Sequence, residues 1–380
     1  MSTARDDSPA DPELTFGVEM EAFAAMEPQH FQALEAKSLR SEIKTRLDAL
    51  PWIETHMLKQ DFMSTAQYAL EPDYSVWNIT EDPSVEPNDC SQFAMHEVCQ
   101  LELISPIYKA NSPDWEQDFR GVLHEETFNP LDQPMIHFET NMFTHLHVHI
   151  GQGTNGFDFR TVRNLALLVL LFEDELDSIH ETRMGFEYTG SSYSMTNLCG
   201  RKLQEVCQTI WHECVAIEDV VEVMCPSSVD YGLWSIEQDP RHYKFNFNAL
   251  LTPKKTVEAR QHEGTLSAPE IIFWVKCLDA LVTAAATVTD ELMFAVMNHG
   301  VYPPDAGRCE VLRLMLRTKR LPTLEEALAY ARGTVLRPVK NDLDFYAYEG
   351  PYVEADFEHV REWFQRKDTT IWYRDSPERA

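Results

Sequence analysis

The stretch His145-Leu-His-Val-His-Ile-Gly151 decides which fold the sequence favours. Alternate residues of a β-strand point to the same side, so its histidines would share one face and its aliphatic residues the other. Imidazoles repeated at a period of two are uncommon by chance, and histidine is a frequent metal ligand. A half-exposed strand with polar histidines outward is the plainer alternative. The stretch predicts a sheet with one face against helices and one face that carries chemistry.

The segment Phe16-Gly-Val-Glu-Met-Glu21 has the same design. Glu19 and Glu21 would lie on one face, about 6–7 Å apart, opposite an apolar face. Two such carboxylates repel each other unless a cation lies between them, and hard divalent cations favour oxygen ligands. The alternative is the solvated polar face of an edge strand.

Two further segments repeat the pattern. In Leu101-Glu-Leu-Ile-Ser-Pro106, Glu102 interrupts an apolar run, although one exposed glutamate is also ordinary in a strand. In Thr256-Val-Glu-Ala-Arg-Gln-His-Glu-Gly-Thr265, Glu258 and Arg260 share a face. Such a pair is either a plain ion pair or part of a site that holds a metal and a phosphoryl group together.

A cation and two amides precede the last of these strands, namely Arg241, Asn246 and Asn248. Arg241 taken alone is equally well a surface arginine. Four strands that each carry Glu, His or Arg opposite an apolar face are harder to explain by chance than any one of them. Together they predict a face where metal ions and arginines supply positive charge for phosphoryl transfer.

The remaining chain predicts helices between groups of strands. Long helices are expected over 31–50, 159–184, 203–224 and 268–297, and shorter ones over 323–333 and 353–367. Residues 52–141 are rich in proline, which suits short strands and long loops, and 243–251 is a further expected strand. This order favours an α+β fold. We expect a disordered tail over 1–13, a catalytic domain over 14–300 and a helical extension over 301–380 packed on the same domain.

Composition limits the classes of function. A formal net charge of −30 repels nucleic-acid backbones, and the sequence has no run of Lys and Arg, so no nucleic-acid partner is expected. The longest apolar stretch, 165–172, is too short to span a bilayer, and the first fourteen residues are polar. Eight cysteines lack a CxxC pair, as in reduced intracellular proteins. A soluble, cytoplasmic protein without a membrane partner is therefore predicted.

The ordered set of segments resembles the amidoligase family, part of the wider group of glutamine synthetases and glutamate-cysteine ligases. The resemblance covers roughly residues 14 to 285 and also includes Asp73-Tyr-Ser-Val76 and Arg241-His-Tyr-Lys-Phe-Asn-Phe-Asn248. Its most specific parts are His147-Val-His-Ile-Gly151 and the 256–265 segment. Two positions depart from the pattern: Ala259 replaces a larger apolar residue, and His145 is an extra histidine without an assigned role.

The resemblance implies a glutamine-synthetase-like catalytic domain, with a curved, mainly antiparallel sheet, an active site on its concave face and helices on the other. It implies a ligase that uses ATP to activate a small carboxylic acid as an acyl phosphate, which an amine of amino-acid or peptide-like kind attacks. Five residues are expected to hold two or more Mg²⁺ ions: Glu19, Glu21, Glu102, His147 and Glu258. Four are expected to contact ATP or the transferred phosphoryl group: His149, Arg241, Asn248 and Arg260. The expected catalytic residues are Arg260, Arg241 and Asp73, the last for the incoming amine.

Two other functions stay open from the residues alone. A zinc-dependent hydrolase would place His145, His147 and His149 on one Zn²⁺ with a glutamate as base. It would leave the glutamates of the first strand and the Glu258–Arg260 pair without a role. A non-catalytic acidic scaffold is the second alternative, and the charged residues retained at every motif argue against it.

Overall fold

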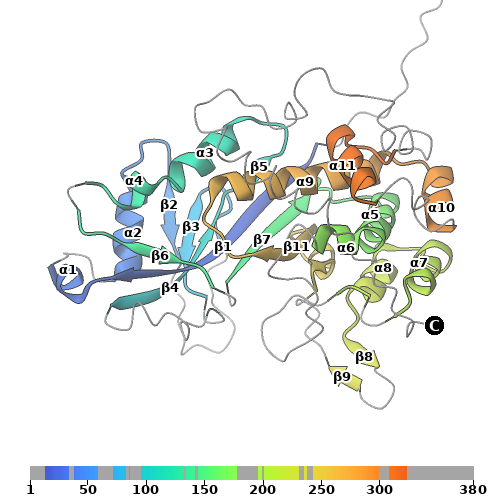
Figure 1. The fold of residues 1–380 in the computed structure, drawn as a ribbon, viewed down its shortest axis with the longest axis horizontal. Helices are drawn as coiled ribbons and strands as arrows, with labels where there is room; N and C mark the ends of the chain where they lie inside the picture. Colours follow the sequence, from blue (N-terminus) through green and yellow to red (C-terminus); the bar gives the residue numbers. More distant parts are fainter. Residues whose placement is uncertain are drawn as a thin grey trace, which may run out of the picture.

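An open, largely antiparallel sheet runs through the centre of the molecule (Figure 1). The structure is a computed structural model, and it describes residues 13–33, 38–58, 72–82, 85, 96–131, 133–141, 144–177, 196–198, 201–230, 235–237, 243–298 and 308–322. The strands of this sheet are β1 (Thr15–Met26), β2 (Thr55–Met57), β3 (Trp77–Thr80), β4 (Glu97–Ile104), β5 (Tyr108–Lys109), β6 (His137–Glu139), β7 (His145–Gly151), β10 (Phe245–Asn246) and β11 (Thr256–Glu263).

The strand order is β10-β11-β7-β1-β4-β3-β2, and the short strands β5 and β6 also pair with β1. Each pairing is antiparallel except that of β2 with β3. Strands β8 (Ser228–Asp230) and β9 (Ser235–Glu237) form a separate antiparallel pair. The four strands singled out from the sequence, β11, β7, β1 and β4, are therefore direct neighbours at the centre of one sheet.

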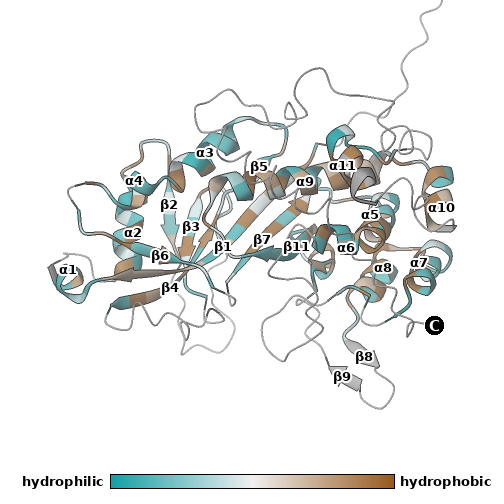
Figure 2. Ribbon diagram, in the orientation of Figure 1, coloured by the Kyte–Doolittle hydropathy of each residue, from teal (hydrophilic) through white to brown (hydrophobic). Residues whose placement is uncertain are grey.

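Alternation along β1 and β7 sets the two faces of the sheet. Figure 2 shows hydrophobic and hydrophilic residues following one another along both strands. The aliphatic members, such as Val18 and Val148, are fully buried in the main core. They pack in one core cluster with residues of α5 (Phe159–Leu171) and α9 (Ala268–Thr287), and α9 also packs on α5 and β7. One face is thus covered by helices, and the charged residues of these strands lie on the other.

The remaining helices lie around this layer: α1 (Pro28–Ala33), α2 (Leu39–Asp48), α3 (Asp114–Val122), α4 (Glu125–Phe128), α6 (Glu173–Asp177), α7 (Leu203–His212), α8 (Ile217–Met224), α10 (Asp290–Asn298) and α11 (Arg308–Thr318). No single helix in the ranges given above is long and apolar enough to cross a membrane. Helices α9 and α10 meet that criterion only as a pair, with a bend of 110° between them. The expected α+β class with a mainly antiparallel sheet is confirmed.

Several predicted elements are longer than the observed ones, and side-chain hydrogen bonds to the backbone mark most of the points where they end. The helix expected over 203–224 is divided between α7 and α8, since Asp219 Oδ2 accepts hydrogen bonds from the backbone N–H groups of Val215 and Ala216. The helix expected over 268–297 breaks where Thr289 Oγ1 accepts from Leu292 N and starts α10. This local capping competes with continuation of the helix.

The strand expected over 243–251 is shortened to β10 in the same way. Asn246 Oδ1 accepts from the backbone N–H of Asn248, and a 3₁₀ helix (Asn248–Leu251) follows. The helix expected over 31–50 becomes α1 and α2, with Ser38 as the N-cap that begins α2. The helix over 159–184 is described as α5 and α6, and its last residues, like the helices expected over 323–333 and 353–367, lie outside the described residues. The predicted domain boundaries stay predictions, although α11 packs against α9.

Candidate active site

Strand register brings the predicted residues onto one face. Glu19 of β1 lies opposite His147 of β7, and Glu258 of β11 lies opposite His149. On the other side of β1, Glu21 lies opposite Glu102 of β4. Alternation along β11 places Arg260 on the same face as Glu258, and the register with β7 shifts by one residue between Ala259 and His262. The site is therefore assembled from four strands that the chain connects only over long distances.

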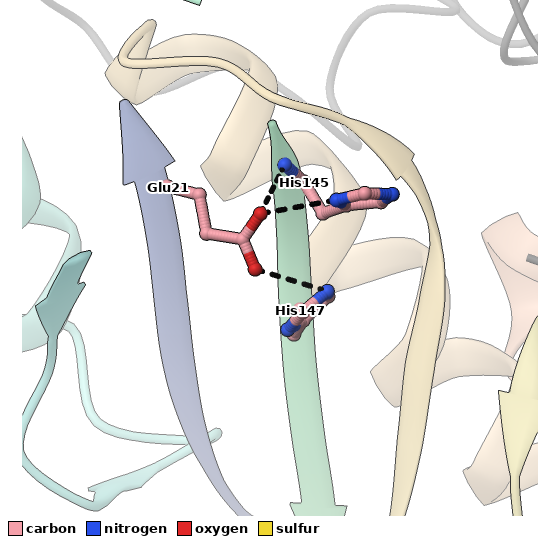
Figure 3. A group of neighbouring side chains, drawn as sticks. All are labelled: Glu21, His145 and His147. Atoms are coloured by element: carbon pink, nitrogen blue, oxygen red, sulfur yellow. Dashed lines mark hydrogen bonds and ion pairs between the residues drawn. The ribbon is translucent and has the colours of Figure 1, made fainter. Parts of the chain in front are cut away.

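Three of these side chains form what we call the inner cluster: Glu21, His145 and His147, all buried (Figure 3). Glu21 Oε2 accepts a hydrogen bond from the backbone N–H of His145 at 2.9 Å and lies 3.0 Å from its Nδ1. Glu21 Oε1 lies 3.7 Å from His147 Nε2. His145, which the sequence pattern left without a role, thus fixes the Glu21 carboxylate from both its main chain and its ring.

A second group, the outer cluster, consists of Glu19, His149 and Glu258. His149 Nε2 lies 3.2 Å from Glu19 Oε1 and 3.9 Å from Glu258 Oε1. Glu258 also accepts from Arg260 Nη1 at 2.5 Å and from Asn246 Nδ2 at 2.7 Å. In each cluster, ligand atoms from all three residues come within 4.8 Å of one another, close enough to share one metal ion.

His147 stands between the two clusters. Its Nδ1 lies 3.5 Å from Glu19 Oε2 and 3.7 Å from Glu258 Oε1, while its Nε2 faces Glu21. Among the described residues, Nε2 of His147 and Nε2 of His149 are buried without a hydrogen-bond partner. A buried polar atom without a partner costs free energy, so two of them aimed at carboxylates indicate a site shaped for a further group.

The two clusters also differ in charge. Burial raises the pKa of Glu21 to about 9, helped by the neighbouring Asp82 and opposed by Arg260. Burial opposes ionisation at Glu258 as well, but His149, Arg260 and His147 outweigh it and lower the pKa of Glu258 to about 2. The pKa of Glu19 is held well below its ordinary value for similar reasons, His149 being its strongest stabilising neighbour. Without a metal, the outer carboxylates are therefore ionised and the inner one is protonated at neutral pH.

Glu102 lies opposite Glu21 of the inner cluster, where carboxylates are its main charged neighbours. Burial and the nearby carboxylates of Glu19, Asp82 and Glu21 raise its pKa well above the ordinary value. Asp82 was not predicted from the sequence, because it follows β3 within a loop and carries no periodic signal. Carboxylates gathered in this way repel one another until a cation arrives.

Lys254 is a second residue that the sequence analysis missed. Its Nζ lies 3.5 Å from Glu19 Oε1 and 5.8 Å from the centre of the Tyr74 ring. Burial alone would lower the pKa of Lys254. Glu19, Tyr74 and Glu258 outweigh this effect and raise the pKa above its ordinary value, so the ammonium group stays charged. The only signal in the sequence was a pair of lysines just before β11, and nothing there shows that one of them turns into the site. Its neighbour Lys255 instead donates to Thr154 O.

Neither Asp73 nor Asn248 is a member of the two clusters. Asp73 is exposed, and its Oδ1 accepts from the backbone N–H and hydroxyl of Ser75. The side-chain amide of Asn248 donates to Asn246 Oδ1 at 3.1 Å. Arg241 lies outside the described residues. Asn246, which was not among the predicted site residues, donates to the clustered carboxylate of Glu258.

Two glycines of the motifs differ in the space around them. A Cβ on Gly264 would come within 2.1 Å of Thr144 Oγ1, so only glycine lets the end of β11 pass beside the start of β7. A Cβ on Gly17 would meet nothing within 4 Å. Because Gly17 lies opposite His149, the floor of the face beside the outer cluster is open.

Comparison with known proteins defines the class. Residues 12–282 match the family described as "putative amidoligase enzyme", which is most of the chain. The protein therefore belongs to this amidoligase family, and the predicted resemblance is confirmed. Membership supports an enzyme of ligase type and gives no support to the hydrolase.

Other comparisons add little. No curated protein matches the chain. Among solved structures, a bifunctional glutathione synthetase from Pasteurella multocida aligns with a TM-score of 0.35 and 13% identity, over 93% of this chain and 49% of that one. The chain spans about half of that protein's length, and so weak a likeness carries no argument about fold or function.

Proposed function

We propose that this face of the sheet catalyses ATP-dependent joining of a small carboxylic acid to an amine, with divalent cations as cofactors. The observation that carries the proposal is the outer cluster, where ionised Glu19 and Glu258 meet Arg260 and Lys254. Carboxylates suit Mg²⁺, and cationic side chains beside them suit phosphoryl oxygens. Both are needed wherever a metal and ATP phosphates are held together.

The residues fit the cations that the family implies. The Nε2 atoms of His147 and His149 are buried without hydrogen-bond partners in the described part of the chain, and both face carboxylates. We infer that Glu19 and Glu258 are the principal Mg²⁺ ligands. Glu21, Glu102 and His147 would be further ligands for the divalent cations. Bound cations would neutralise negative charge on the phosphates, which a protein of net charge −30 otherwise repels.

The side chains of this protein then act mainly by position and charge. Arg260, fixed by Glu258 at 2.5 Å, would present the rest of its guanidinium to the transferred phosphoryl group. Lys254 and His149 would contact phosphate oxygens above the open floor beside Gly17. Arg241 and Asn248 stay candidates for ATP contacts, and exposed Asp73 for the ammonium group of the amine.

The proposed reaction balances without a protein nucleophile. The substrate carboxylate attacks the γ-phosphorus of ATP, and ADP leaves. The amine nitrogen then attacks the acyl carbon, inorganic phosphate leaves, and the nitrogen loses a proton to form the amide. We infer that the open antiparallel sheet is a glutamine-synthetase-like catalytic sheet, which would place both reactants on its uncovered face.

An ATP-consumption screen tests the proposal. Purified protein is incubated with Mg²⁺, ATP and pools of carboxylic acids and amines, and products are resolved by mass spectrometry. A hit is repeated with the carboxylate labelled with ¹⁸O. We expect one labelled oxygen in the released phosphate, because the acyl phosphate transfers it. Amide formation without label in phosphate would contradict the acyl-phosphate route, and hydrolysis of amides without ATP would contradict the ligase.

A further inference from the structure

The inner cluster differs from the outer one in the kind of ligand it offers. It combines two imidazoles with one carboxylate, whereas the outer cluster combines one imidazole with two carboxylates. Mg²⁺ is a hard ion that favours oxygen ligands and keeps several waters. Imidazole nitrogen instead suits transition-metal ions such as Mn²⁺, Co²⁺ and Zn²⁺. The difference between the clusters is therefore one of metal preference.

The spacing of the inner ligands matches one small ion. Two ligand atoms about 2.1 Å from a shared metal lie about 3.0 Å apart at a right angle and about 3.4 Å apart in a tetrahedron. The Glu21 oxygens lie 3.0 Å from His145 Nδ1 and 3.7 Å from His147 Nε2. Figure 3 shows both rings directing these nitrogens toward the same carboxylate. One ligand atom from each of the three residues lies within 4.8 Å of the other two, so coordination of one ion would draw these side chains closer together.

The surroundings of His147 favour a metal on its Nε2. That atom is buried without a hydrogen-bond partner in the described structure, and the opposite ring nitrogen lies near Glu19, Glu258 and Arg260 Nη1. A metal-binding histidine usually has a carboxylate or carbonyl at its other nitrogen, which sets the ring orientation and the tautomer. Glu21 is fixed independently by the main-chain N–H of His145. Both ligands are thus held in place before any ion binds.

We propose that Glu21, His145 and His147 form a separate binding site for a transition-metal ion of the Mn²⁺, Co²⁺ and Zn²⁺ class, beside the Mg²⁺ site of the outer cluster. The inference rests on the proposed function only for the identity of the outer ion. It assigns His145, the extra histidine of the motif, as a metal ligand. The ion would tie β1 to β7 and hold His147 against the outer cluster.

Metal binding tests this without any turnover. Protein stripped of metal with a chelator is titrated with Co²⁺, and binding is measured by visible absorption. Zn²⁺ and a large excess of Mg²⁺ are then tested as competitors for the bound Co²⁺. We expect one Co²⁺ per chain, displaced by Zn²⁺ and not by Mg²⁺. His145→Gln should weaken Co²⁺ binding by at least about 100-fold, because losing a direct ligand costs no less than losing a supporting residue.

Two variants serve as controls for this loss. His149→Gln removes an imidazole of the outer cluster, and His262→Gln removes a buried histidine of β11 that packs on Trp274. Both should bind Co²⁺ within about 10-fold of the unchanged protein, less than the loss expected for a ligand. Glu21→Gln removes the carboxylate ligand while keeping the size of the side chain. Circular dichroism establishes that each variant is folded.

The outcomes separate this inference from the proposed function. Displacement of Co²⁺ by Mg²⁺, or equal losses in His145→Gln and His149→Gln, would overturn the separate site. Ligase activity in a protein that binds no Co²⁺ or Zn²⁺ would overturn it while leaving the proposed function in place. Tight Co²⁺ binding that depends on His145, in a protein without ATP-dependent activity, would support the site and contradict the proposed function.

Discussion

The two clusters lie on the same face of the sheet, yet the carboxylates in them differ in charge. Arg260 and Lys254 contact the carboxylates of the outer cluster, which is therefore ionised in advance. In the inner cluster, Glu21 is met by two imidazoles and is protonated until a cation binds. Alternation along a strand thus determines which face a side chain lies on, whereas side chains from neighbouring strands determine its charge.

The largest effect is expected at Arg260. Arg260→Lys keeps one positive charge but loses the planar fork that can contact Glu258 and a phosphoryl oxygen together. We expect the rate of ATP-dependent amide formation to fall by about 100-fold or more, as when a stabilising donor is lost from an active site. Arg163→Lys, whose arginine pairs with Asp290 on α10, is the matched control and should keep its activity. Co²⁺ binding at the inner cluster should be retained in both variants.

A smaller effect is expected at Lys254. Lys254→Met keeps most of the stem and removes the charge that faces Glu19 at 3.5 Å. We expect about a 5-fold loss of activity and a weaker apparent affinity for ATP, since a cation in a partly exposed ion pair contributes about 1 kcal/mol. Lys255→Met is the neighbouring control, because Lys255 donates to Thr154 O instead. Equal losses in the two variants would show that the effect is general charge and not a contact at the outer cluster.

Stability without metal should separate the clusters by sign. The pKa of Glu21 is raised in the folded protein. Its contribution to the free energy of unfolding is therefore fully present below the unfolded value near 4.5 and is lost as pH rises toward about 9. The pKa of Glu258 is lowered to about 2, so its contribution is present above about 4.5 and is lost as pH falls toward that value.

Thermal unfolding of the metal-free variants therefore gives opposite shifts. At pH 8, Glu21→Gln should raise Tm by a few degrees, because the neutral amide replaces a carboxyl that must stay protonated or be buried charged. Glu258→Gln should lower Tm by a similar amount, since a charged hydrogen-bond partner of Arg260 and Asn246 is removed. Shifts of the same sign in both variants would break the distinction between the clusters.

Much of the site could be predicted from the sequence because strand periodicity needs no tertiary information. Glu19, Glu21, Glu102 and the histidines of β7 lie on one face as expected, and β11 supplies Glu258 and Arg260. The predicted helix boundaries were wrong where single side chains, such as Asp219 and Thr289, cap the start of a new helix. Those hydrogen bonds compete with helix continuation by amounts too small to read from composition.

Residues outside the periodic strands could not be placed. Lys254 and Asp82 lie in loops, so their approach to Glu19 and Glu102 depends on how distant strands pair. The grouping of the histidines was equally hidden. One face holds all three, but the neighbouring glutamates divide them between two clusters, His145 and His147 in one and His149 in the other.

The most direct test of the account is calorimetric binding of a non-hydrolysable ATP analogue to the unchanged protein and to Glu258→Gln. The account places the nucleotide phosphates at the outer cluster, with Mg²⁺ held by Glu19 and Glu258. It predicts binding to the unchanged protein that requires Mg²⁺, and loss of most of that binding in the variant at the same Mg²⁺ concentration. Binding of equal strength in both proteins, or binding unaffected by removal of Mg²⁺, would contradict the assignment of this face as the ATP site.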